Sequence, residues 1–89
     1  MFKRVHTTLG PHKIEVSNSW FTGAKLFIDG QLVSKNHGIL ALDKKKVQMK
    51  AVVQIDGVDH SIEVFAWAPF ISVKLKICAD GQQIGGDKF

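Results

Sequence analysis

Residues 47–68 carry the pattern that most constrains the fold, because apolar and polar side chains alternate along them on both sides of an Asp-Gly pair. The odd positions from Val47 to Ile55 are all apolar, while most of the even ones are polar. A period of two is typical of a strand with one buried face. Asp56-Gly57 suits the positive φ angles of a type I′ turn, so we predict a two-residue hairpin.

The turn also predicts which residues face one another in this hairpin. Placing Ile55 opposite Val58 pairs Val53 with His60, Ala51 with Ile62, Met49 with Val64 and Val47 with Ala66. A shift by one residue would mix the two faces, so the register is well specified.

A third strand follows at residues 72–79, which completes a three-stranded meander over residues 47–79. Pro69 cannot take a positive φ, so we expect a four-residue loop before this strand rather than a tight turn. The expected apolar pairs are Ala66 with Val73, Val64 with Leu75 and Ile62 with Ile77. On the reverse face, Glu63 is expected between Lys50 and Lys76, Phe65 opposite Lys74, and Cys78 opposite Ser61.

Other segments also read as short strands separated by turns. We expect strands at residues 13–20, with Trp20 at the inner end, and at residues 24–28, 32–35, 39–42 and 83–89, and an edge strand or arm at 2–9. Asp29-Gly30 predicts a second hairpin. Its faces are mixed, since Leu26, Ile28 and Val33 share one side while Phe27 and Leu32 share the other. This indicates that both sides are covered or that the loop is longer than two residues. Asp80-Gly81 predicts a third, with Ile77 opposite Ile84 and Lys74 opposite Asp87. The segments between the Asp-Gly pairs differ, so no sequence repeat is predicted.

Seven or eight short strands with no helical periodicity predict an all-β fold, either a small antiparallel β-sandwich or a partly open barrel. A chain of 89 residues is expected to form a single β domain over residues 1–89. Such a short chain buries little core, so dimerisation would help to stabilise it.

The strand–Asp-Gly–strand segments at residues 26–33 and 72–83, with the closing Asp87-Lys88-Phe89, resemble hairpins of the Fas apoptotic inhibitory molecule family. This resemblance covers about a third of the chain. It implies a small antiparallel β-sandwich without enzymatic activity.

Charge and cysteine content bear on location and partners. The net charge of +4 permits binding to nucleic acid or anionic surfaces without requiring it. One cysteine cannot form an internal disulfide, which fits a reducing compartment. The sequence shows neither a secretory signal nor an apolar run long enough to span a membrane. We therefore expect a cytoplasmic protein with no membrane partner.

Candidate catalytic and metal-binding residues have simpler structural explanations. Cys78 lacks a nearby base, since His60 projects to the other face in the predicted register. The four histidines are not spaced as zinc ligands, and Asp29, Asp56 and Asp80 are explained as turn residues. We predict no enzyme, no metal and no cofactor.

The outward face of the meander is the predicted interaction surface. It carries Phe65 and Trp67 among Lys50, Lys74 and Lys76. Aromatic side chains on a nominally polar face are typical of protein interfaces, so we predict association with a second copy or with another protein, as a homodimer or an adaptor. The alternative is weak binding of single-stranded nucleic acid, in which bases stack on the rings and lysines attract phosphates.

Overall fold

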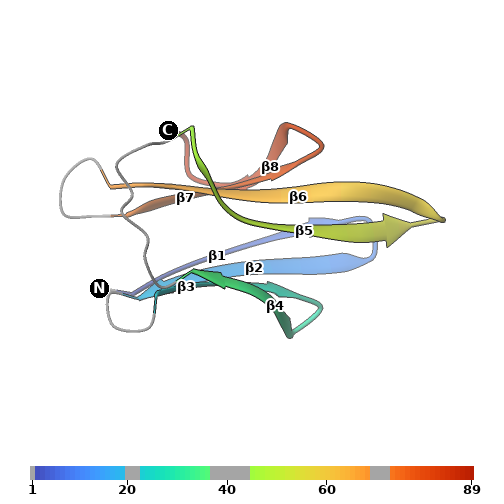
Figure 1. The fold of residues 1–89 in the computed structure, drawn as a ribbon, viewed down its shortest axis with the longest axis horizontal. Coiled ribbons are helices and arrows are strands. Elements are labelled where there is room, and N and C mark those ends of the chain that lie inside the picture. Colours follow the sequence, from blue (N-terminus) through green and yellow to red (C-terminus); the bar gives the residue numbers. More distant parts are fainter. Residues whose placement is uncertain (1, 20–22, 37–44, 69–72) are drawn as a thin grey trace.

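The computed structural model describes residues 2–19, 23–36, 45–68 and 73–89, which form eight antiparallel strands in two four-stranded sheets (Figure 1). The N-terminal sheet has the order β1 (Phe2–Leu9), β2 (His12–Ser19), β3 (Gly23–Ile28) and β4 (Gln31–Asn36). The C-terminal sheet has the order β5 (Val47–Ile55), β6 (Val58–Trp67), β7 (Lys74–Ala79) and β8 (Gln82–Gly86). The predicted all-β sandwich is confirmed, whereas the sheets do not close into a barrel. Trp20 and the predicted strand at 39–42 lie outside the described residues.

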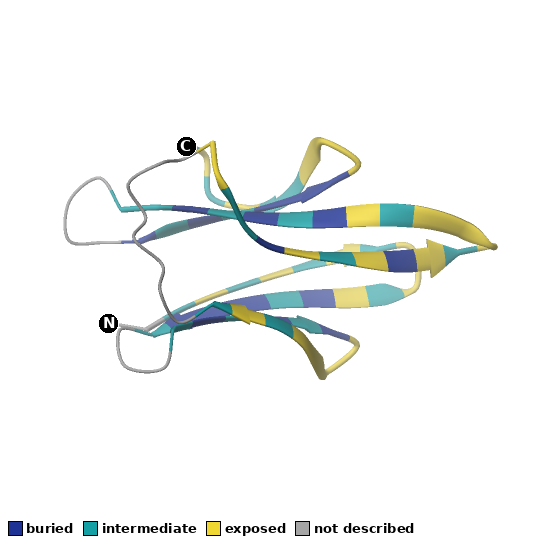
Figure 2. Cartoon of the chain, in the orientation of Figure 1, coloured by how far each residue is buried: buried dark blue, intermediate teal, exposed yellow. Residues whose placement is uncertain are grey.

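The core is a single apolar layer between the two sheets, and buried residues alternate with exposed ones along the strands (Figure 2). Its largest fully buried side chains come from both sheets: Ile14, Val16 and Leu26 from one, and Ile62, Val64, Leu75 and Ile77 from the other. Each contributes roughly 1.5–3 kcal/mol relative to an exposed side chain. The alternation predicted from the sequence therefore builds the core.

The β5–β6 hairpin has the predicted register over most of its length. Ile55 lies opposite Val58, Ala51 opposite Ile62 and Met49 opposite Val64. The prediction for Val47 is wrong, because an irregularity between Val47 and Met49 places Val47 opposite Phe65.

The β6–β7 pairing differs from the predicted register by two residues. Ile62 lies opposite Ala79, and likewise Val64 opposite Ile77 and Ala66 opposite Leu75. A shift of two keeps each side chain on its face but changes its neighbour. On the outer face, Phe65 is therefore opposite Lys76, Trp67 opposite Lys74 and Glu63 opposite Cys78, which corrects the three pairs predicted there. The predicted four-residue loop at residues 68–71 lies, except for Ala68, outside the described residues.

Asp29, Asp56 and Asp80 form the predicted tight turns, with φ angles of 53°, 52° and 51°. The glycine that follows each has φ between 78° and 85°. Positive φ at both central residues is the geometry of a type I′ hairpin turn.

The β3–β4 hairpin, which turns at Asp29, and the β7–β8 hairpin, which turns at Asp80, each contain a β-bulge that was not predicted. Leu26 pairs with Ser34 and Phe27 with Leu32, which leaves Val33 as the extra residue and explains its mismatch with the inner face. In the C-terminal sheet, Ile77 pairs with Gly85 and Cys78 with Gln83, so Ile84 is the extra residue rather than the partner of Ile77.

The two sheets match each other in sequence and in hydrogen bonding. His12-Lys13-Ile14-Glu15-Val16 on β2 corresponds to His60-Ser61-Ile62-Glu63-Val64 on β6. Asp29 accepts a hydrogen bond from the Lys13 main-chain N at 2.9 Å, and Asp80 accepts the same bond from Ser61 at 2.9 Å. Each aspartate also contacts a histidine Nδ1, His12 at 2.7 Å and His60 at 2.6 Å. The chain thus consists of two matching halves, although no repeat is predicted from its sequence.

Polar contacts join the sheets along both sides and at the turn end. At one side the Thr7 hydroxyl donates to the Ile84 carbonyl at 2.6 Å, and at the other the Asn36 amide donates to the Gln48 carbonyl at 3.1 Å. At the turn end, His12 Nε2 lies 2.9 Å from the Gln54 carbonyl oxygen. Since the Asp29 carboxylate and the Gln54 carbonyl both only accept, the His12 ring bonds to both when it is protonated.

Gly86 and Gly30 provide a test of close packing at β8. Both have positive φ, but a Cβ at Gly86 would lie 2.2 Å from the Leu75 carbonyl oxygen, whereas nothing lies within 4 Å of one at Gly30. Gly30→Ala should cost roughly 1–2 kcal/mol of unfolding free energy, from positive φ alone. Gly86→Ala should cost about 1–3 kcal/mol more, because the strands must also move apart. Equal losses in urea unfolding would contradict the clash.

His12 should make the stability depend on pH. The hydrogen bond to Asp29, and then that to Gln54, raises the pKa of His12 above its usual 6.5. Its contribution is therefore fully present below pH 6.5 and is lost as the pH rises through the raised value. We expect the thermal unfolding midpoint of the wild type to fall, relative to His12→Gln, from about pH 6 to about pH 8.5. Parallel pH profiles for the two proteins would contradict this role.

Candidate functional site

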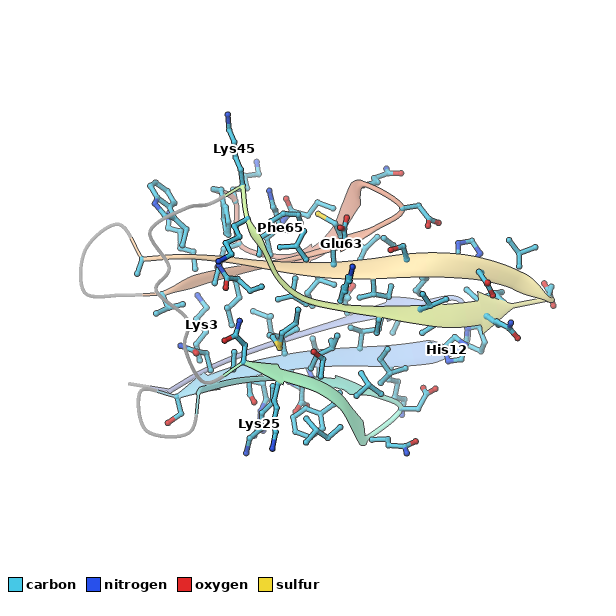
Figure 3. All side chains as sticks on the ribbon, in the orientation of Figure 1. Lys3, His12, Lys25, Lys45, Glu63 and Phe65 are labelled. Carbon is cyan, nitrogen blue, oxygen red and sulfur yellow. The ribbon has the colours of Figure 1, made fainter. Side chains whose placement is uncertain are left out.

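The five residues predicted for the interaction surface all lie on the outer face of the C-terminal sheet. Phe65 and Trp67 belong to β6, Lys74 and Lys76 to β7, and Lys50 to β5. The two aromatic side chains and the two β7 lysines are half-buried, whereas Lys50 is exposed. Figure 3 shows Phe65 and Glu63 on the side of the sheet that faces away from the N-terminal sheet.

Four of the five form one cluster of rings and ammonium groups. Lys76 Nζ lies 5.0 Å from the Phe65 ring centroid, and Lys74 Nζ lies 5.8 Å from that of Trp67. These distances are within the range of cation–π attraction. Lys50 is separate from them, since it pairs with Glu63 in the next row of the sheet.

Phe89 is a further member of the cluster, and the alternation of side chains does not predict it. Its ring centroid lies 6.0 Å from that of Trp67 and 4.6 Å from Lys76 Nζ. The Lys76 ammonium therefore lies near two rings, those of Phe65 and Phe89. We refer to Phe65, Trp67, Lys74, Lys76 and Phe89 as the aromatic–lysine face.

Asp87 positions Phe89 by fixing the residues after β8. Its main-chain N donates to the Leu75 carbonyl at 2.7 Å, and its carboxylate accepts from the Leu75 N at 3.0 Å. Lys3 Nζ lies 2.8 Å from the same carboxylate. Burial acts against ionisation, but the Lys3 and Leu75 hydrogen bonds hold the pKa of Asp87 below its usual value. Asp87 is thus bound to Leu75 rather than facing Lys74 as predicted, and this fold-dependent contact helps to bring Phe89 to the site.

Cys78 lies beside this face but is poorly suited to nucleophilic chemistry. It is 7% exposed and lies opposite Glu63. Burial raises the pKa of the Cys78 thiol; the Lys76 ammonium opposes this effect and the Glu63 carboxylate adds to it. His60, the histidine considered as a base, bonds to Asp80 instead.

The described part of the chain offers no cluster of three His, Cys, Asp or Glu side chains that could hold a metal ion. In the same residues, no helix is long and apolar enough to cross a lipid bilayer. What the described outer face of the C-terminal sheet presents is aromatic surface with fixed positive charge.

Cys78 should react slowly with alkylating reagents. Because the thiolate is the nucleophile, a raised pKa and low exposure both reduce the rate. We expect iodoacetamide to modify the folded protein at least about tenfold more slowly than free cysteine near pH 8. The urea-unfolded chain is the control and should react at the ordinary rate. A fast reaction in the folded state would instead support a reactive thiol.

Comparison with models of protein families finds no matching family, and comparisons with curated proteins and with solved structures find no significant match.

Proposed function

We propose that this chain is a non-enzymatic β-sandwich that binds an acidic segment of another protein through the aromatic–lysine face. The observation that carries the proposal is the placement of two ammonium groups among three rings at 4.6–5.8 Å. A non-enzymatic role agrees with what the resemblance to the Fas apoptotic inhibitory molecule family implies. The free Cys78 thiol fits a cytoplasmic location.

The rings reduce the entropic cost of binding. A lysine on an open surface samples many rotamers, and fixing it in a complex costs about 0.5–1.5 kcal/mol. Lys74 and Lys76 are half-buried and attracted to neighbouring rings, so part of this cost is met before a partner arrives. Carboxylates of a partner can pair with the two ammonium groups without displacing them from the rings.

The sign of the charge favours a different partner over a second copy. Two copies that met through this face would bring Lys74 and Lys76 against their own equivalents, and like charges in contact are unfavourable. The net charge of +4 adds a general repulsion between copies and a general attraction for acidic chains.

The contacts also favour a protein partner over single-stranded nucleic acid. Stacking of bases requires accessible ring faces. Here ammonium groups lie close to the Phe65, Trp67 and Phe89 rings, and Trp67 and Phe89 also contact each other. A base would have to displace these contacts.

Titration with a short peptide of alternating Glu and Leu residues, followed by amide chemical shifts, tests the proposal. We expect saturable shifts on β6 and β7 and binding weakened by about tenfold or more in Lys76→Glu, because a charge pair becomes a repulsion. Lys25→Glu is the matched control and should bind normally. Lys25 precedes Asp29 by four positions as Lys76 precedes Asp80, but it lies on the other sheet.

Three outcomes would overturn the proposal. Tighter binding of oligothymidylate than of the peptide would favour the nucleic-acid alternative. Sedimentation showing a dimer that Trp67→Ala dissociates would favour self-association. Equal effects of Lys76→Glu and Lys25→Glu on peptide binding would show that only net charge matters.

A further inference from the structure

The outer face of the N-terminal sheet contains an open hollow of about 640 Å³. It lies over β1, β2 and β3, and its lining includes His6, Thr8, Lys13, Glu15 and Phe27. This volume falls within the usual 300–1,000 Å³ of sites for small molecules. The hollow is on the opposite side of the sandwich from the aromatic–lysine face.

Phe27 supplies the apolar surface of the hollow. Its ring projects from β3 between Glu15 on one side and Leu32 on the other, and it is half-buried. Leu32, opposite Phe27 on β4, is 44% exposed and extends the apolar surface. At the position of Phe27 the other half of the chain has Cys78, so this ring is not required by the shared fold. A flat apolar group can stack on it.

The acidic groups around the hollow already have basic side chains as partners. Glu15 Oε1 lies 3.3 Å from His6 Nδ1, and Oε2 lies 3.5 Å from Arg4 Nε. Asp29, which follows β3, contacts the His12 ring at 2.7 Å. These pairs offset much of the negative charge that would otherwise repel an anion.

Lys13 supplies a positive charge to the hollow and, after the His12 hydrogen bond, contributes to the lowered pKa of Asp29. Its main chain is bound to Asp29, but no ion pair of its ammonium group occurs within the described ranges. Lys13 is exposed and lies opposite Thr8, whose hydroxyl adds a donor on the same face. The polar side of the hollow therefore offers a cation and a hydroxyl next to an aromatic surface.

We propose that this hollow binds a small aromatic carboxylate, with the ring of the ligand on Phe27 and its carboxylate at Lys13 and Thr8. A carboxylate accepts hydrogen bonds from both donors, and its charge complements the ammonium group. The site is independent of the aromatic–lysine face, since the two use different sheets and share no residue.

Three naphthalene probes that carry a negative, a neutral and a positive substituent test the proposal: 2-naphthoate, 2-naphthalenemethanol and 2-naphthylmethylamine. Each is titrated into the isotope-labelled protein and followed by amide shifts. We expect 2-naphthoate to bind saturably with shifts at Thr8, Lys13 and Phe27, and about tenfold more tightly than the alcohol. The amine should bind most weakly.

Variants separate the two halves of the site. Lys13→Gln should weaken 2-naphthoate about tenfold and leave the alcohol unchanged, because only the charge is removed. Phe27→Ala should weaken all three probes, and Phe27→Leu keeps the test valid if the alanine variant unfolds. Lys25→Gln is the matched control, since Lys25 lies on β3 like Phe27 but does not line the hollow.

The proposal is overturned if 2-naphthoate gives no saturable shifts, or if its shifts cluster at Phe65 and Trp67. Tighter binding of the amine than of the carboxylate would show that Glu15 dominates the site and would also overturn it.

Discussion

The carboxylates of Asp29 and Asp80 hold β3 against β2 and β7 against β6. Asp80 accepts a hydrogen bond from the Ser61 main-chain N and donates its own N–H to the Ser61 carbonyl, at 2.9 Å in both cases. These bonds place the start of the β7–β8 turn beside β6. First the Ser61 bond and then the His60 contact lower the pKa of Asp80, which favours the ionised carboxylate. The turn aspartate thus determines strand pairing as well as chain reversal.

This constraint explains which part of the fold could be predicted. In the β5–β6 hairpin, Asp56-Gly57 joins the strands directly, so the alternation of side chains and the turn together specify the register from Ile55 to Met49. Between β6 and β7 the alternation alone allows any even shift, and the predicted pairs are two residues away from those observed. The observed register is the one in which Ser61 and Asp80 exchange hydrogen bonds, and no periodicity encodes these bonds.

In the candidate site, too, alternation was predictable and register was not. Alternation correctly places four residues on one face: Phe65, Trp67, Lys74 and Lys76. Which lysine lies opposite which ring depends on the register, and the predicted pairing of Phe65 with Lys74 is wrong. Phe89 could not be predicted, because it follows the strand and is placed by the bonds of Asp87 to Leu75. The positions of the β-bulges at Val33 and Ile84 likewise depend on the backbone conformation and not on the alternation of side chains.

The two matching halves were hidden by unequal spacing, since 17 positions separate His12 from Asp29 and 20 separate His60 from Asp80. What the halves share serves the fold: the histidine and aspartate that bond to each other, and the buried Ile14 and Val16 that match Ile62 and Val64.

The halves also differ on their outer faces. Phe27 of the N-terminal sheet corresponds to Cys78, and Phe65 of the C-terminal sheet corresponds to Ser17. Each sheet therefore has an aromatic side chain where the other has a small one. The two aromatic positions do not correspond to each other. Since the fold is satisfied by either residue, these positions are free to carry binding chemistry. The two faces point in opposite directions, so a partner protein on one leaves the hollow on the other accessible to its ligand.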